Sequence, residues 1–358
     1  VCLKNDENSR VACEVLATKG NIIVAGEITS AYEPDVFAVV RKVLSDVGYS
    51  SEGVTMDTFV HRQSPDIAEA VNASKERRGG VSDNQIDWFQ GAGDQGVMIG
   101  YACDETKQLM PMPVVLANRI VRELSACRQS SYIQGILPDG KAQVTVEYEN
   151  GKPVRLDSVV VSCQHKEEKD LKKLEAEIRK KVLLPALRPL PPDEETKIYI
   201  NPSGRFVCGG LDADTGLTGR KLMVDSYGSM VPHGGGAFAG KDCSKVDRSA
   251  AYMARYIAKN IVAAGLASKC QVSLAYAIGV AEPVMIEVDT FGTGKVCADD
   301  CLAAAIPLVF GVTPVQIMES LRLNRPIFRQ TAVFGHFGRK EFPWERTDKV
   351  LALQDAIL

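Results

Sequence analysis

Three stretches of the sequence repeat one pattern, in which two short strands joined by a tight turn are followed by a helix. The three units comprise strands at Val11–Ala17 and Ile22–Ile28 with a helix from about Pro34 to Val47, strands at Ala142–Tyr148 and Val154–Ser162 with a helix from about Glu167 to Leu184, and strands at Gln271–Ile278 and Val284–Thr290 with a helix near Asp299–Phe310. The hairpins begin about 130 residues apart, a spacing longer than that of short solenoid repeats. The pattern predicts three similar α+β domains, each a mainly antiparallel sheet with helices on one face.

Chance is the alternative explanation, since a hairpin followed by a helix is a common unit. The length of 358 residues favours two or three domains in either case. We expect an N-terminal domain over residues 1–77, a central domain over 91–209 and a C-terminal domain over 210–350. The connecting segment Ser74–Gln90 is rich in glycine, charged and polar residues, so we predict a mobile loop over residues 78–90.

The charge balance and the cysteines narrow the class of protein. The net charge is -3, whereas nucleic-acid binders more often carry a basic excess, so we expect no nucleic-acid partner. The ten cysteines include no CxxC pair and no zinc-like spacing, which favours a reducing, cytoplasmic setting. No apolar run approaches the ~20 residues that cross a bilayer, so we expect no membrane partner.

A glycine-rich run that ends in lysine, GGGAFAGKD over Gly234–Asp242, carries the clearest sign of function. Its spacing is close to that of a phosphate-binding P-loop, but Asp242 stands where serine or threonine should hold magnesium, and no strand runs directly into it. Small residues still let backbone amides approach phosphate oxygens. A flexible surface loop is the alternative interpretation.

A long helix follows this run, with an apolar face formed by Val246, Ala250, Met253, Ile257 and Ile261. We expect the segment 244–247 to cap its start, and Asp299 or Asp300 to cap the last of the three repeated helices. Lys241 and Lys245 lie at the N-terminal end of the long helix, where cations oppose the helix dipole. An anionic ligand between the two lysines would remove this conflict.

Other charged residues lie beside glycine-rich or turn-like backbone throughout the chain. A triphosphate bound with a divalent metal needs cations and carboxylates close together. The candidate cations are Lys141, Arg205, Arg220, Lys221, Lys241 and Lys245, and the candidate carboxylates are Asp94, Asp139, Asp214 and Asp247. Folding or an oligomer interface must bring them together. For each of the four histidines a structural or surface role is favoured, and no Ser/His/Asp catalytic set is evident.

Six motifs together resemble the S-adenosylmethionine synthase (methionine adenosyltransferase) family. They are GAGDQG at 91–96, GLTGRK at 216–221, GGGAFAGKD at 234–242, KVDRSAAY at 245–252, YAIGVAEP at 276–283 and GHFGR at 335–339. The resemblance runs from Arg10 to Lys349. It implies three similar α+β domains related by pseudo-threefold symmetry, and a homodimer or homotetramer with active sites between subunits.

The resemblance also implies the reaction and its participants. The sulfur of L-methionine attacks the ribose 5′ carbon of ATP and displaces triphosphate, which is then hydrolysed to pyrophosphate and phosphate. Mg²⁺ and K⁺ are the implied cofactors. Because the protein supplies little covalent chemistry, positioning and charge stabilisation must do most of the work.

Residue roles follow from the resemblance at matching positions. Lys141, Arg220 and Lys241 are the implied catalytic cations. The implied ATP-binding residues are Asp139, Gly140, Lys141, Arg205, Phe206, Asp214, Arg220, Lys221, Ala237 and Lys241. The implied methionine-binding residues are Glu27, Gln63, Asp214 and Lys245, with Gln63 at the start of the mobile loop. Glu14 matches a potassium position and Asp247 a magnesium position.

The sequence departs from the family in three places. The family begins with a His-Pro-Asp segment, whose histidine helps triphosphate to depart and whose aspartate binds magnesium, and this sequence contains none. Because Val1–Lys4 is typical of the last turn of a helix, we expect the native protein to carry that segment upstream. Ala239 and Leu137 replace a usual serine and arginine, and we expect both to be tolerated. A catalytically silent nucleotide-binding homologue or regulatory partner is the alternative function, and a generic ATPase is disfavoured by Asp242.

Overall fold

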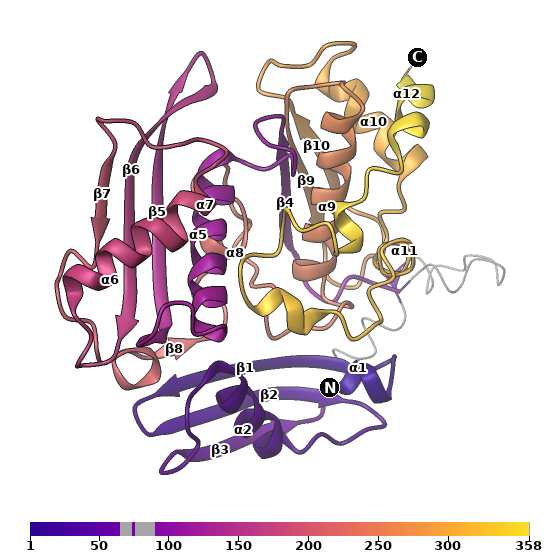
Figure 1. Ribbon diagram of the computed structural model, residues 1–358. Coiled ribbons are helices and arrows are strands. Elements are labelled where there is room, and N and C mark those ends of the chain that lie inside the picture. The colour runs from indigo at the N-terminus through magenta and orange to yellow at the C-terminus, as the bar shows by residue number, and fades with distance from the viewer. Residues whose placement is uncertain (65–73, 76–89, 358) are drawn as a thin grey trace.

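The computed structural model describes residues 1–64, 74–75 and 90–357, and contains three sheets with their helices (Figure 1). The predicted mobile loop lies, apart from Gln90, outside these residues. The three predicted units are present, as β1–β2–α2, β5–β6–α6 and β9–β10–α10. Five of the seven strand pairings are antiparallel. The predicted α+β class with three sheet-containing units is therefore confirmed.

The first sheet has the order β3-β2-β1-β8. It contains β1 (Arg10–Thr18), β2 (Asn21–Thr29), β3 (Thr55–His61) and the short β8 (Gly216–Leu217), after the N-terminal helix α1 (Cys2–Asn5). Helix α2 (Val36–Val47) packs its apolar stripe against one face, where Ile22, Val24 and Leu44 are buried. Asp35 caps α2 by accepting from the Ala38 amide, and Gly48 ends it at φ 104°.

The second sheet has the order β5-β6-β7. It comprises β5 (Ile136–Glu149), β6 (Lys152–His165) and β7 (Lys197–Ile200). Its covering helices are α5 (Met112–Gln129) and the continuous run of α6 (Leu171–Ile178), the π-helix η2 (Arg179–Leu183) and α7 (Leu184–Ala186). Leu116 and Ile120 of α5 meet Val159 and Val161 of β6 in one buried cluster.

The third sheet has the order β10-β9-β4. Strand β4 (Gly96–Cys103) lies beside β9 (Lys269–Tyr276), which pairs with β10 (Met285–Asp289). The core helix is α9 (Val246–Ala263), and its residues from Val246 to Val262 are all buried except Asp247. The remaining elements around it are η3 (Gly210–Asp212), α8 (Leu222–Asp225), α10 (Asp299–Val309), α11 (Pro314–Ser320), η4 (Phe328–Ala332), η5 (Pro343–Glu345) and α12 (Val350–Ile357).

Two strands belong to a different sheet from the one that their position in the chain predicts. Strand β4 falls inside the range 91–209 expected for the central domain, yet it belongs to the third sheet. Strand β8 falls inside the range 210–350, yet it pairs with β1 of the first sheet through Leu16 and Leu217. The sheets are therefore not built from contiguous ranges, and the expected domain limits stay a prediction.

Neither of the two expected helix caps is formed. Helix α9 begins after Lys245, and α10 begins after Ala298, and neither N-cap residue makes a side-chain cap hydrogen bond. The carboxylate of Asp299 instead accepts from the amide and the hydroxyl of Thr290. At the start of α10, Thr290 therefore occupies the carboxylate that was expected to cap the helix.

Within the described residues no single helix is long and apolar enough to span a membrane, and the one helix pair that passes by length and composition, α10 with α11, is bent by 74°.

Candidate active site

The end of the glycine run lies along the edge of β1. Cys13 donates its amide to Gly240 O at 2.8 Å, and Asp242 donates its amide to Val11 O at 3.0 Å. Gly240 has φ 83°, and a Cβ there would lie 2.4 Å from Cys13 O, so this close approach requires glycine. The run thus forms a bridge between Lys241 and Ala12 that joins the third unit to the first sheet.

Asp242 is buried and holds this junction together. Its Oδ2 accepts from the Val11 amide at 2.5 Å and from Lys245 Nζ at 2.6 Å, while its Oδ1 accepts from the Ser244 amide at 2.7 Å. The residue that excludes a P-loop is therefore a structural anion. Sequence reasoning gave it no positive role, although the mismatch with the P-loop pattern already marked the position.

Lys241 pairs with Asp247 in the first turn of α9, with Nζ and Oδ2 2.5 Å apart. The two carboxylates Asp242 and Asp247 therefore compensate Lys245 and Lys241 at the helix N-terminus. The chain thus supplies anionic partners for both lysines, and the anionic ligand expected between them stays a prediction. A Cβ on Gly236 would lie 2.1 Å from Asp247 Oδ1, so the run needs glycine beside this carboxylate.

Glu14 lies close to the same lysine. Partial burial raises the pKa of Glu14, and the charge of Lys241 opposes this rise. Register places His61, Glu27, Ala12 and Lys241 in one row across the first sheet. Since side chains alternate between faces, this row and Glu14 share the face opposite α2.

We call this face of the first sheet the charged face; it carries Glu14, Glu27 and Lys241. Two strand spacings, about 10 Å, separate the backbones of Glu27 and Lys241. Glu27 lies 3.7 Å from His61 Nε2, and Gln63 donates its amide to Thr29 Oγ1 at 3.3 Å near the end of the same strands. The structure therefore places Glu14, Glu27 and Lys241 on one face, with Asp247 paired to Lys241, and does not bring Asp214 or Lys245 to it.

Residues of GLTGRK lie next to the glycine run. The Thr218 amide donates to Val15 O at 3.0 Å, and the Cβ of Ala237 lies beside Gly219. Arg220 is exposed and reaches Thr215 O at 3.4 Å, and Lys221 precedes α8 as its N-cap. Asp214 accepts from the Thr215 amide.

A second group of expected site residues lies at the end of β6. His165 is 2% exposed, its Nε2 accepts from the Phe206 amide at 3.0 Å, and its Nδ1 lies 2.8 Å from Lys166 O. His165 therefore has the structural role expected for it. Asp139 Oδ2 accepts from the Gly210 amide at 2.8 Å, which attaches the start of β5 to this group.

The remaining cations of the second group are exposed. Arg205 pairs with Glu167 at 2.6 Å, with side chains 65% and 75% exposed. Lys141 is exposed on β5, and its register with Ser162 places it on the face opposite α5, next to Gly140. Among the described residues no hydrogen bond or ion pair joins this group to Lys241. The structure thus forms two charged groups rather than one.

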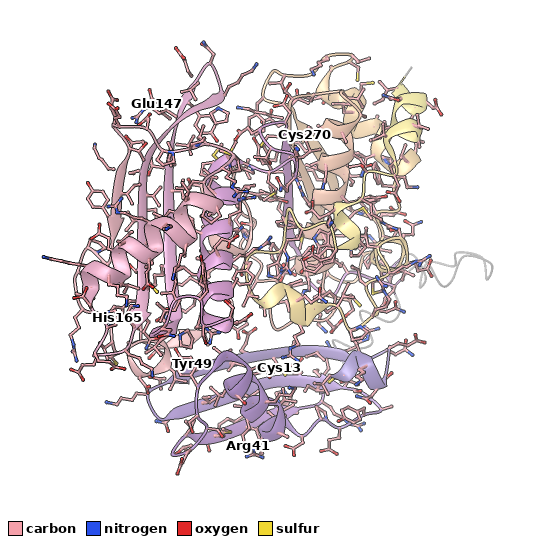
Figure 2. All side chains as sticks on the ribbon, in the orientation of Figure 1. Cys13, Arg41, Tyr49, Glu147, His165 and Cys270 are labelled. Carbon is pink, nitrogen blue, oxygen red and sulfur yellow. The ribbon has the colours of Figure 1, made fainter. Side chains whose placement is uncertain are left out.

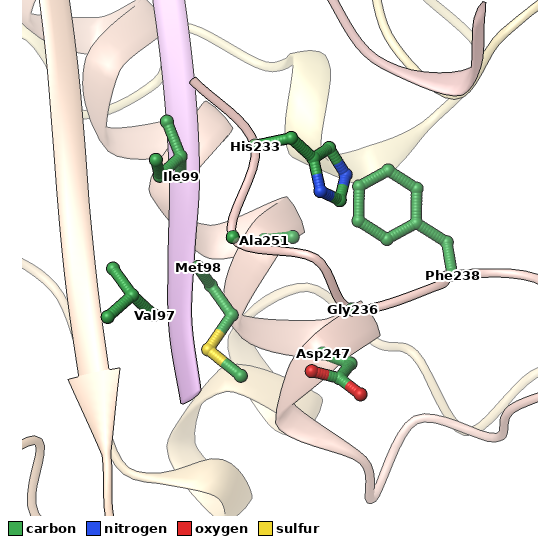
Figure 3. Close-up of a pocket in the computed structure, with 9 residues that line it drawn as sticks. Val97, Met98, Ile99, His233, Gly236, Phe238, Asp247 and Ala251 are labelled. Atoms are coloured by element: carbon green, nitrogen blue, oxygen red, sulfur yellow. The ribbon is translucent and has the colours of Figure 1, made fainter. Parts of the chain in front are cut away.

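His233 shapes the glycine run from within the third unit. Its Nδ1 accepts from the Gly235 amide at 2.9 Å, and burial lowers its pKa. The proton of the neutral ring therefore lies on Nε2, which is buried and has no partner within the part of the chain that the structure describes. Figure 3 shows the ring beside Phe238, in the wall of a cavity of about 10 Å³ that also reaches Asp247. That volume holds about one water molecule, not a substrate.

The residues present fit a hard cation that takes part of its ligands from substrate. Asp247 and Glu14 supply the carboxylate oxygens that such ions prefer. Among the described residues no three histidine, cysteine, aspartate or glutamate side chains converge on one point. Mg²⁺ often binds through one or two carboxylates together with substrate phosphates, so Asp247 suits it without a complete protein site.

The fold and these contacts define a three-domain α+β protein in which a glycine run ends in a lysine–carboxylate pair beside the charged face. Family models for the N-terminal, central and C-terminal domains of S-adenosylmethionine synthetase match residues 1–71, 89–206 and 208–346. Proteins described as S-adenosylmethionine synthase from two strains of Staphylococcus epidermidis are each 49% identical over 365 residues, covering 99% of this chain and 91% of theirs. The chain belongs to the S-adenosylmethionine synthetase family.

Proposed function

We propose that this protein is a methionine adenosyltransferase that makes S-adenosylmethionine from ATP and L-methionine. Family membership over nearly the whole chain supports this reaction, and so does the Lys241–Asp247 pair at the charged face. The methionine sulfur attacks the ribose 5′ carbon, and the C5′–O bond breaks so that the triphosphate leaves with the bonding electrons. Hydrolysis then converts triphosphate to pyrophosphate and phosphate.

Stabilisation of the leaving triphosphate is the proposed role of Lys141, Arg220 and Lys241. Fixed cations are effective because they need no reorganisation as negative charge builds up on the bridging oxygen. Lys241 is held in place by Asp247, while Arg220 and Lys141 are exposed and free to meet phosphate oxygens. Bound Mg²⁺ would neutralise phosphate charge, with Asp247 as its protein ligand, and K⁺ would use Glu14.

The other residue roles are proposals of the same kind. Asp139, Gly140, Arg205, Phe206, Lys221 and Ala237 would form the nucleotide site, Asp214 would lie between nucleotide and methionine, and Glu27, Gln63 and Lys245 would contact methionine. Glu27 and Gln63 support this assignment, since both lie near one end of the pair β2 and β3. Lys245 supports it less, because its ammonium is paired with buried Asp242.

A homodimer, or a homotetramer built from it, would bring the two charged groups together. The faces opposite the helices expose large apolar side chains, namely Phe59, Leu217, Val97, Met285 and Tyr199. Exposed apolar surface of this kind is typical of protein interfaces. Burying these faces against a second copy would place Lys141 of one subunit opposite the charged face of the other. We also propose a cytoplasmic setting, because all ten cysteines are free.

Product analysis tests the function directly. The native full-length protein is incubated with ATP, L-methionine, Mg²⁺ and K⁺, and the products are separated with and without methionine. We expect the sulfonium product together with pyrophosphate and phosphate, and no ADP. ATP turnover to ADP without methionine would identify a generic ATPase instead, and nucleotide binding without product would favour the catalytically silent homologue.

A further inference from the structure

A second cavity lies away from the charged face, where the three units meet. It has a volume of about 430 Å³. Its walls come from the end of α2, the second half of α5, the start of β5, the end of β6 and the segment 329–334, which begins within η4. We call it the junction pocket. Small-molecule sites usually have volumes of about 300–1,000 Å³ and occur often between domains, so both size and place suit a ligand.

The walls of the junction pocket are mainly apolar. Leu124, Ile136 and Cys163 form its buried part. Val43, Val47 and Val333 lie at the exposed part and are 50%, 41% and 54% accessible. An apolar cavity with an exposed apolar rim favours a ligand with an apolar body, because such a ligand removes this surface from water.

One cation in the wall is unpaired. Arg128 of α5 is half-buried, and its guanidinium makes no hydrogen bond or ion pair with any residue in the described ranges. Its Nη1 lies 3.2 Å from the place that a Cβ on Gly48 would occupy, at the C-terminal end of α2. That helix end attracts a cation, but it leaves the five N–H donors of Arg128 without a full set of acceptors.

The other charges of the wall already have partners. Arg329 pairs with Asp46 at the rim, and Asp46 is also paired with Lys42. Asp139 accepts from the Gly210 amide. Tyr49, labelled in Figure 2 beside the lower end of α5, lies close enough to both Asp139 and Arg128 for their charges to act on its hydroxyl. An added acidic group would therefore meet Arg128 as its free partner.

We propose that the junction pocket binds a small molecule with an apolar body and one acidic group, which Arg128 holds by charge-assisted hydrogen bonds. The site is separate from the charged face, since it contains none of Glu14, Lys241 and Asp247. Its wall does include Asp139 and Gly140, which belong to the proposed nucleotide site and immediately precede Lys141. An occupant therefore contacts the segment that carries one proposed phosphate-binding lysine, as an effector would.

A fluorescent probe with the required chemistry, 8-anilinonaphthalene-1-sulfonate, tests the proposal on the full-length protein. We expect saturable binding of one probe per chain. Arg128→Gln should raise the Kd at least about tenfold, because a lost charge-assisted contact accounts for roughly that change. Val47→Trp, at the exposed rim, should raise it similarly by closing the entrance. The matched controls Arg179→Gln and Leu184→Trp change an exposed arginine and an exposed leucine on the second unit and should bind the probe as the unaltered protein does.

The outcomes separate this site from other apolar surfaces. Equal binding by Arg128→Gln, Val47→Trp and the unaltered protein would overturn the proposal, as would the absence of saturable binding. Displacement of the probe by a non-hydrolysable ATP analogue with Mg²⁺, one for one, would show that the pocket is part of the nucleotide site and would also overturn it. Because Val47 is exposed, its variant keeps the test valid if Arg128→Gln does not fold.

Discussion

Helix α9 takes part in ion pairs at its middle and at its N-terminal end. The two regions differ in how many of the hydrogen-bonding groups of the paired side chains are used. In the middle of the helix, Arg255 is 0% exposed and all five of its N–H donors are used, by Glu345 and by three backbone carbonyls. Glu345 also accepts from Lys259 and from the Gly338 amide. Arg255 and Glu345 therefore have no capacity left for a ligand.

At the N-terminal end of the same helix, the pair is left incomplete. Lys241 has three donors and makes one side-chain hydrogen bond among the described residues, to Asp247. Both side chains keep some exposure, 20% and 12%. The comparison teaches that spare hydrogen-bonding capacity, rather than the presence of an ion pair, separates a candidate ligand site from a structural one.

Removing one member of the buried triad should have the largest effect. Glu345→Gln leaves two buried cations without their anion, which costs about 3–5 kcal/mol in the free energy of unfolding. Urea unfolding followed by circular dichroism measures it. Glu175→Gln, at an exposed pair with Arg179, is the control and should change stability by less than about 1 kcal/mol. Equal losses for both variants would contradict the distinction between buried and exposed ion pairs.

Lys241→Ala should have the opposite profile. We expect kcat to fall by about 10²–10³-fold, the usual loss for one fixed group that stabilises developing charge. The Tm should fall only slightly, because the pair is partly exposed. Lys173→Ala, an exposed lysine on α6, controls for general charge effects. A variant that loses its Tm as steeply as its activity would mean that Lys241 is structural.

The third prediction concerns how stability depends on pH through the buried residue His336. His336 is buried against Tyr252 of α9, and burial, with Arg248 and Arg339 nearby, lowers its pKa to about 3. The unfolded state therefore binds the proton first, so stability is fully present above about pH 6.5 and is lost as pH falls from there towards 3.

The stability that His336 loses in acid can be measured by comparing two variants that differ only at His336. It is up to about 1.4 kcal/mol per pH unit from His336 alone. Burial raises the pKa of neighbouring Asp225 to about 6, which destabilises the fold as pH rises from about 4 to 6 and opposes His336 in that range. We therefore compare Asp225→Asn with Asp225→Asn/His336→Gln. A steeper acid loss in the single variant is expected, and parallel curves would refute the assignment.

The smallest effect is expected at the exposed Arg205–Glu167 pair. Glu167→Gln should change the free energy of unfolding by less than about 1 kcal/mol, because both side chains are largely in water. Releasing Arg205 should leave the KM for ATP unchanged or slightly lower. A higher KM would indicate that Glu167 positions Arg205 for the nucleotide, in which case exposure would be a poor guide to role.

The sequence was sufficient to predict the elements whose signals are local. The hairpin turns and the apolar face of α9 depend on residues close in the chain. The periodic apolar residues of α5, Met112, Leu116, Ile120 and Leu124, give an equally local signal that the sequence analysis did not use. Short β7 gives little signal of its own.

Long-range pairing was beyond local reasoning. Nothing in residues 96–103 indicates that β4 pairs with β9 rather than with the strands that follow it, because edge hydrogen bonds carry no sequence code. The structural role of Asp242 was likewise beyond local reasoning, because its carboxylate accepts from the Val11 amide of β1 across a separation of 231 residues.

The junction of β1 with residues 216–242 has a consequence for how the chain is made. Val15 and Thr218 meet across a separation of 203 residues. At a synthesis rate of 5–20 residues per second, the edge of β1 stays unpaired for about 10–40 s after its own strand has been translated. An open strand edge is a template for association with other chains. Nascent copies on one messenger RNA therefore pass through an interval in which shielding by a chaperone should most improve the yield of folded protein.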